Sequence, residues 1–390
     1  MSLRRTAVTL ALTLCAVALG AGEPGDFIIA NARSAALGGP HIAHADDFFT
    51  LHVNPAGLRF IEPRFTYAAL SAGASGPVFT LAGIMVEGVA GADLSSLLAS
   101  PSVQDVLQGI HARAQLSGPL AFGFAGGGAG FGVYNDTALT VRATGSSGIE
   151  IRLGERFLLR GGYGFEVPTP SRWNARGAVG VGVKGFVRGD SVLSTSLVTL
   201  PSLADSIGPD LLSESPFEIV SGLGIDVGLM LVWRDQVGAA VTLDNLYSPN
   251  AVIAYTSLDR FLESAESPPT TYDRYPRRLN VGLAYTPSLG TAERYVQDLR
   301  VLLDYRDVLD FWTNPAEAEN VVLKFGAGVE ATFLRILSLR AGFSRGLPAA
   351  GLGLDLGFVR LQAAMFGTEL SREPGLRPAY NLLVGLEFGQ

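Results

Sequence analysis

The stretch FGAGVEATFLRILSLRAGFS, residues 325–344, decides the fold of this chain. Its larger apolar side chains stand at every second position, first over residues 325–333 and again over residues 337–343. Glycine, small residues and the charged Glu330 and Arg340 occupy the positions between them. Alternation of period two predicts β-strands whose two faces differ in character.

The same alternation recurs along most of the chain, which gives about 14 predicted strands. The clearest examples cover residues 65–69, 139–143, 149–153, 179–187, 223–233, 237–243, 279–286, 299–306, 325–333, 337–344 and 380–388. The second face carries mostly glycine and alanine, whereas a soluble β-sandwich would place many charged residues there. We therefore predict an all-β fold, an antiparallel transmembrane β-barrel of about 14 strands with an apolar band toward lipid. A soluble periplasmic β-protein is the alternative.

Composition supports this prediction. The chain has 390 residues, of which 48 are glycine and only 17% are charged, against roughly 25% in an average soluble domain. The formal net charge of −7 argues against a nucleic-acid binder. Residues 1–21 combine Arg4 and Arg5 with an apolar run and small residues, which predicts a signal peptide and export.

No later stretch is expected to cross a membrane as a helix. The uncharged stretch at residues 116–134 contains seven glycines and Pro119, so a hairpin is the better interpretation. Aromatic residues at the strand edges are expected to form girdles at the membrane interfaces. They are Tyr67, Tyr134, Trp233, Tyr285, Phe333 and Tyr380.

The N-terminal stretch NARSAALGGPHIAHADDFFTLHVNPAGL, residues 31–58, contains ALGG, AxADD and NPAGL in this order. In this it resembles FadL-type outer-membrane transporters of hydrophobic compounds and their PorV-like relatives. The alternating last strand, residues 380–388, is similar to the terminal strand of outer-membrane barrels, although Gly389 and Gln390 follow its final aromatic residue.

The resemblance implies that residues 22–62 form an N-terminal hatch inside a barrel of residues 63–390, with long loops near 87–117, 188–216 and 245–277. It also implies that extracellular loops capture a ligand, which passes to a pocket in the lumen and leaves when the hatch shifts. The resemblance assigns the hatch motif to five residues. They are Asp46, Asp47, Asn54, Pro55 and Ala56.

The hatch residues carry physical expectations of their own. Pro55 fixes its φ angle and restricts Asn54, so this pair suits a chain reversal within a lumen. Asp46 and Asp47 need cationic partners when buried. The candidates for these partners, and for ligand binding, are cations on the faces turned away from lipid. They are Arg142, Arg152, Lys184 and Arg340. The alternative is that such cations only neutralise Asp226, Glu330 and the hatch aspartates.

Other chemistry finds little support. Gly180, Gly182 and Gly185 match GxGxxG but lie in a predicted strand with no helix after them. The histidines His41, His44 and His52 lack the fixed spacing of a metal site. We therefore expect no catalytic residues, cofactor or metal, and no enzyme.

Two functions remain open for a protein of the cell outer membrane. The first is passive uptake of long-chain fatty acids or other hydrophobic molecules, with outer-membrane lipid around the barrel. The alternative is a non-transporting scaffold or shuttle that binds a secreted or surface partner through its loops. Lumen-side glycines, such as Gly180 and Gly228, are expected to leave room beside the hatch.

Overall fold

The computed structural model describes residues 31–77, 110–144, 148–196, 213–313, 315 and 318–389. The predicted signal peptide and most of the predicted loops near 87–117 and 188–216 lie outside these residues.

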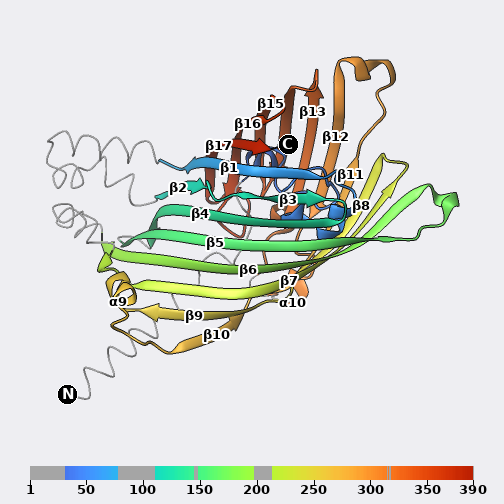
Figure 1. Ribbon diagram of the computed structural model, residues 1–390. Coiled ribbons are helices and arrows are strands. Elements are labelled where there is room, and N and C mark those ends of the chain that lie inside the picture. The colour runs from blue at the N-terminus through green and yellow to red at the C-terminus, as the bar shows by residue number, and fades with distance from the viewer. Residues whose placement is uncertain are drawn as a thin grey trace, which may run out of the picture.

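The described residues form one antiparallel sheet that closes on itself, because the first strand pairs with the last (Figure 1). Its strands, in chain order, are β1 (Arg64–Ser75), β2 (His111–Ser117), β3 (Phe122–Gly126), β4 (Ala129–Thr144), β5 (Gly148–Val167), β6 (Ala175–Ser196), β7 (Phe217–Trp233), β8 (Val237–Tyr247), β9 (Pro249–Tyr255), β10 (Thr270–Arg274), β11 (Arg278–Tyr285), β12 (Val296–Tyr305), β13 (Phe325–Phe333), β14 (Leu337–Ser344), β15 (Leu347–Asp355), β16 (Val359–Glu369) and β17 (Pro378–Gly389).

Three places in the barrel wall are each occupied by two strand pieces in line. β2 and β3 both pair with β1 and β4, and β8 and β9 both pair with β7. β10 and β11 continue one another along β9 and β8. Over the described ranges the barrel therefore has 14 strands, which confirms the predicted all-β antiparallel barrel.

The strands extend into the predicted loops. Part of the predicted loop at 245–277 is β-structure, namely β9 and β10, and β9 pairs with the early part of β7. The turn-rich composition there marks the break at Ser248 and the connection over residues 256–269. Likewise β6 continues to Ser196 and β2 begins at His111, so described strand residues lie within the predicted loops near 188–216 and 87–117.

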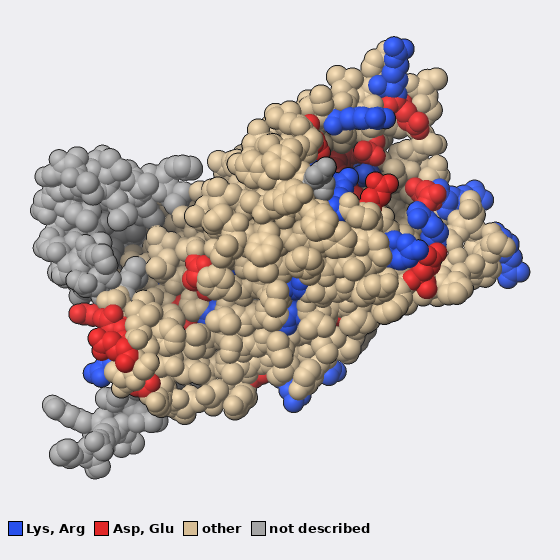
Figure 2. Space-filling model, in the orientation of Figure 1, with Lys and Arg blue, Asp and Glu red and all other residues tan. Residues whose placement is uncertain are grey.

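The two faces of the wall differ as the sequence pattern predicts. Side chains such as Leu229 and Leu283 are about half exposed on the outer face, whereas their neighbours point inward and are buried. Figure 2 shows a broad band of uncharged surface between charged groups gathered toward the two ends. Tyr134 corrects the girdle prediction, because it points inward and is 1% exposed. Tyr134 lies on the same face of β4 as Gly132 and Asp136, two residues before and after it, and both of these face the interior.

The wall is much taller on one side than on the other. β5 and β6 have 20 and 22 residues, whereas β14 has 8. On β5 the exposed large apolar residues run from Phe157 to Val167. Glu155 precedes them and accepts a hydrogen bond from Thr137. The outer face of β5 is therefore polar at this position and apolar from Phe157 onward.

The helices of the described residues are short, and none is long and apolar enough to cross a membrane. They are α2 (Ala32–Ala36), α3 (Thr50–Val53), η1 (Pro55–Arg59), η2 (Ser171–Trp173), α9 (Leu258–Leu262), η3 (Gly290–Arg294), α10 (Asp310–Thr313) and α11 (Val321–Lys324).

Candidate functional site

Residues 31–61, which we name the inner segment, lie against the inward faces of the wall. Figure 1 shows this segment in dark blue. α2 contacts β14 to β17, and η1 contacts β3 to β7, so the segment reaches opposite sides of the barrel. Its contacts divide it into a charged half, residues 31–47, and an apolar half, residues 48–61.

Asn54 organises the apolar half. Its side-chain Oδ1 accepts a hydrogen bond from the Ala56 amide at 3.0 Å, which caps the start of η1. Its Nδ2 donates to the carbonyl oxygens of Ile42 at 2.9 Å and Leu229 at 3.3 Å. Asn54 therefore ties the apolar half both to the charged half and to β7, and its side chain is fully buried.

Wall glycines let this part of the segment approach closely. A Cβ atom on Gly180 would lie 2.1 Å from the Ala56 nitrogen, and one on Gly228 would lie 2.0 Å from the Asn54 Oδ1. Both distances are impossible for a real side chain. The space that these glycines leave in the lumen is therefore filled by the inner segment.

Arg33 is the centre of the charged half. Its Nη1 donates to Asp46 at 2.7 Å and to Asp47 at 3.0 Å. Its Nε and Nη2 donate to the two oxygens of Glu330 on β13, at 3.0 and 2.6 Å. One guanidinium thus joins two carboxylates of the segment to a carboxylate of the wall, the fork geometry for which arginine is suited.

Two wall arginines complete this network. Arg300 Nη1 on β12 donates to Asp46 at 2.6 Å and to Glu330 at 3.3 Å. Arg340 on β14 donates from Nε to Glu330 at 2.7 Å. Glu330 is 2% exposed, so this ionic network is buried and depends on each member having its partners.

Electrostatics keep both central groups of the segment charged. Burial by itself would raise the pKa of Asp46, but Arg33, followed by His44 and Arg300, holds it well below its usual range. Burial by itself would lower the pKa of Arg33, and Asp46 and Glu330 outweigh it and raise that pKa well above its usual value.

Asp304 on β12 binds the middle of the charged half. Its carboxylate accepts hydrogen bonds from the His41 ring Nδ1 and, at 3.0 Å, from the Ile42 amide. The other ring nitrogen of His41 lies 2.8 Å from the Leu37 carbonyl oxygen. Arg306 adds a bond to the Gly38 carbonyl at 2.9 Å. The charged half is therefore held by directional bonds along its length.

The predicted cationic partners of the hatch aspartates are wrong, because Arg33 and Arg300 occupy that role. The four predicted cations point inward but have other carboxylate partners. These pairs are Arg142 with Glu150, Arg152 with Glu150 and Asp190, Lys184 with Asp226, and Arg340 with Glu330. Their assignment to ligand binding stays a prediction.

Asp226 on β7 is the centre of a second buried charge cluster. It accepts hydrogen bonds from Lys184 Nζ at 2.8 Å, from Arg160 and from the Asn245 amide. Arg160 also donates to the His52 carbonyl oxygen at 3.0 Å, which links this cluster to α3. Burial, followed by Arg160 and Lys184, lowers the pKa of His52 well below its usual value, so the ring is neutral.

No metal centre is found in the part of the chain that the structure describes: His, Cys, Asp and Glu side chains do not gather there in threes around a possible ion.

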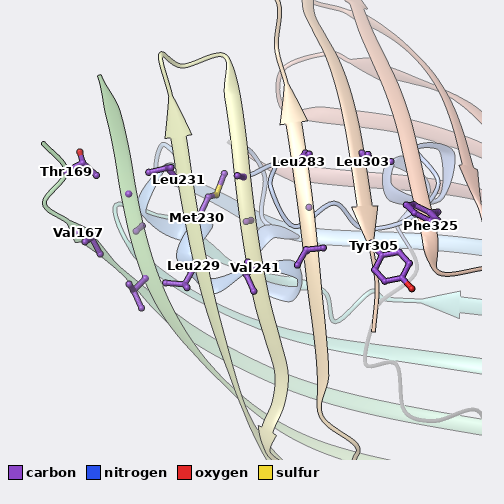
Figure 3. Close-up of a pocket in the computed structure, with 17 residues that line it drawn as sticks. Val167, Thr169, Leu229, Met230, Leu231, Val241, Leu283, Leu303, Tyr305 and Phe325 are labelled. Atoms are coloured by element: carbon purple, nitrogen blue, oxygen red, sulfur yellow. The ribbon is translucent and has the colours of Figure 1, made fainter. Parts of the chain in front are cut away.

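The outer wall carries an apolar depression of about 660 Å³ beside the inner segment (Figure 3). Residues of β5 to β8 and of β11 to β13 line it, including the exposed Leu229 and Leu283. Met230 borders it from the inner side of the wall, and its sulfur lies 3.8 Å from where a Cβ on Gly57 would be. One buried side chain therefore separates the outer depression from η1.

Sequence reasoning missed Arg33, Arg300, Glu330 and Asp304 as residues that hold the inner segment. Glu330 interrupts an inward face of small residues with a charge, and Asp304 lies on the same face of its strand as Arg300 and Arg306, which were usable signals. Nothing in the sequence pairs either residue with the N-terminal stretch, because that pairing depends on where the segment lies across the barrel.

No family model matches the chain, and no curated protein matches it. Among solved structures, the CymD monoaromatic hydrocarbon channel is 11% identical with a TM-score of 0.50, over 94% of this chain and 98% of CymD. A mutant of the TodX monoaromatic hydrocarbon channel is 13% identical with a TM-score of 0.44, over 94% and 99%. A FadL homologue from Pseudomonas aeruginosa is 10% identical with a TM-score of 0.41, over 94% and 99%.

The likeness to CymD extends over nearly the whole of both chains. At this identity it concerns the fold. The resemblance seen in residues 31–58 is thereby confirmed at the level of the fold: the chain has the architecture of the FadL-type hydrocarbon channels.

Proposed function

We propose that the protein is an outer-membrane channel for passive uptake of hydrophobic molecules, with long-chain fatty acids among the candidates. The main support for this proposal is the position of the inner segment. It occupies the lumen against Gly180 and Gly228, which argues against an open water pore. The apolar outer band supports insertion in a membrane, and the fold likeness to a hydrocarbon channel supports a hydrophobic cargo.

In the proposed mechanism the inner segment is the hatch, which comprises residues 22–62 of the exported chain. Extracellular loops capture the ligand, a lumen pocket receives it, and movement of the hatch releases it. Because Arg142, Arg152, Lys184 and Arg340 already have carboxylate partners, a fatty-acid head would compete with those partners. Burial of the acyl chain, at about 0.8 kcal/mol per methylene, then provides most of the affinity.

The test combines conductance with ligand displacement. In planar bilayers the purified protein should show little steady ion conductance. In detergent or liposomes it should bind a fluorescent fatty acid that oleate, or an aromatic hydrocarbon, displaces. Porin-like conductance with no displaceable binding would reject the channel for hydrophobic molecules, and would favour the scaffold for a secreted or surface partner.

A further inference from the structure

Three buried hydrogen-bond donors meet where the inner segment contacts the wall, and none of them has an acceptor. They are the Nε2 of His52 on α3, the hydroxyl of Tyr134 on β4 and the Nε of Arg160 on β5. The His52 and Tyr134 rings are 4.2 Å apart in a T-shaped arrangement, and Arg160 bonds the His52 carbonyl at 3.0 Å. The unmet donors therefore form one cluster.

The geometry fixes the tautomer of His52. Arg160 Nη1 lies 3.3 Å from the His52 Nδ1, and a guanidinium can only donate. Nδ1 is therefore the acceptor of a neutral ring, and the ring proton is on Nε2. The Nε2–H is then a donor without an acceptor, as is the Arg160 Nε–H, and the Tyr134 hydroxyl can donate as well. A buried donor without an acceptor requires an explanation in a native structure.

The charges around the cluster are balanced. Arg160 and Lys184 are the cations, Asp226 accepts hydrogen bonds from both of them, and Asp244 on β8 acts on Lys184 as a second carboxylate. The cluster thus offers hydrogen bonds without surplus positive charge. This chemistry suits a neutral oxygen, as in an alcohol, phenol, ketone or ester, better than a carboxylate.

The surroundings of the donors are apolar. The Phe48 ring stacks on Tyr134 with centroids 5.3 Å apart, and Leu51 and Leu158 belong to the same packed cluster. The three polar atoms are sealed from solvent, with less than 1 Å² of each exposed. An acceptor can therefore reach them only when α3 moves away from β4.

We propose that His52, Tyr134 and Arg160 form a subsite for the neutral oxygen of a hydrophobic ligand, which becomes accessible when α3 moves away from β4. This inference rests on the proposed function and narrows its cargo to hydrophobic molecules that carry one uncharged oxygen. Such a ligand replaces the missing acceptor, whereas a plain hydrocarbon leaves the donors unmet.

The test compares the binding of ethylbenzene, acetophenone and phenylacetate to the full-length protein. Acetophenone adds a carbonyl oxygen to the hydrocarbon, and phenylacetate carries a charged head. In Tyr134→Phe the ratio of the ethylbenzene Kd to the acetophenone Kd should fall about three- to tenfold, the effect of one hydrogen bond. His52→Phe should lower the same ratio. Tyr163→Phe is the matched control, because Tyr163 is 48% exposed on the outer face of β5.

Thermal stability separates this role from a structural one. Tyr134→Phe removes a hydroxyl that has no partner, so its Tm should stay unchanged or rise. An unchanged Kd ratio in both variants, or tighter binding of phenylacetate than of acetophenone, would overturn the subsite while leaving the channel for hydrophobic molecules intact. Failure of both ethylbenzene and acetophenone to bind the unaltered protein would overturn the subsite and count against the channel as well.

Discussion

The two halves of the inner segment are held to the same barrel by different sets of contacts. The charged half is fixed by directional bonds, in which Arg33, Asp46 and Glu330 each have ionic partners. The apolar half packs closely against wall glycines, as the charged half also does, and its buried bonds to the wall are those of Asn54 with Leu229 and of Arg160 with His52, whose Nε2 lacks an acceptor. The difference teaches that the buried ionic bonds are gathered in the charged half, so under the proposed function we expect movement of the segment to begin in the apolar half.

Hydrogen–deuterium exchange can follow the two halves separately, because peptides from residues 31–47 and 48–61 report on each. Exchange protection measures the free energy of local opening. The predictions that follow use this readout on the folded barrel.

The largest effect is expected from Glu330→Gln. This change leaves Arg33, Arg300 and Arg340 without the buried carboxylate that they share. Loss of one member of a buried ionic network costs about 3–5 kcal/mol, so protection of the charged half should fall by that amount. The apolar half should change far less.

Glu166→Gln is the matched control for this prediction. Glu166 pairs with Arg59, but both side chains are about half exposed, so the loss should stay within about 1 kcal/mol. Equal losses in the two variants would show that burial of the Glu330 network does not hold the charged half.

A change of intermediate size is expected from Gly180→Val. The new side chain collides with the backbone at Ala56, where a Cβ would lie 2.1 Å from the nitrogen. Overpacking of this kind costs about 1–3 kcal/mol, and here it should lower protection of residues 48–61 while the charged half keeps its protection.

Gly185→Val provides the comparison on the same strand. A Cβ on Gly185 meets only Leu223, at an ordinary 3.4 Å, so this variant should retain the exchange pattern of the unaltered protein. If Gly180→Val also retains it, the contact between Ala56 and the wall does not fix the apolar half.

The smallest effect is expected from mild acid, and it should reach the apolar half first. Burial, followed by Arg160 and Lys184, lowers the pKa of His52 in the closed segment. Below about pH 6.5 the His52 ring therefore binds a proton in the released segment but stays neutral in the closed one. Closure therefore weakens as pH falls below about 6.5, by at most about 2 kcal/mol at pH 5.

Asp46 responds in a lower pH window. Because its pKa is held well below the usual value, its contribution is complete above about pH 4 and is lost only as pH falls through the lowered pKa. Exchange at pH 7 and 5, corrected for intrinsic rates, should thus show loosening of residues 48–61, and His52→Phe should abolish it. Earlier loosening around Asp46 would contradict this order.

Much of the barrel is predictable from the sequence because side-chain alternation has a fixed period. Runs such as residues 325–333 and 337–344 report their two faces directly, and the predicted strand number agrees with the structure. Prediction failed where pairing is long-range. The residues of β9 and β10 were assigned to a loop. β9 pairs with β10 and with β7, and the local sequence does not reveal these pairings.

The inner segment shows the same limit. Burial of Asn54 and Ala56 agrees with the expectation from the NPAGL stretch, while their role as part of a moving hatch stays a prediction. The partners of Asp46 could not be predicted, because Arg33 becomes its neighbour through the fold of the segment and Arg300 through its position across the lumen. The inward orientation of Tyr134 was predictable, since Gly132 and Asp136 lie on the same face of the strand.

The unequal heights of the wall give the barrel an oblique rim. About 10 residues suffice for a strand to cross a bilayer, and the apolar outer run of β5 ends near Phe157. We therefore expect the residues of β5 before Phe157, together with the paired part of β6, to extend beyond the lipid on this side of the barrel. This extension is on the order of 30 Å along the strands. β14, with 8 residues, has no such extension, so under the proposed function we expect a lipid-soluble molecule to enter on this low side of the barrel.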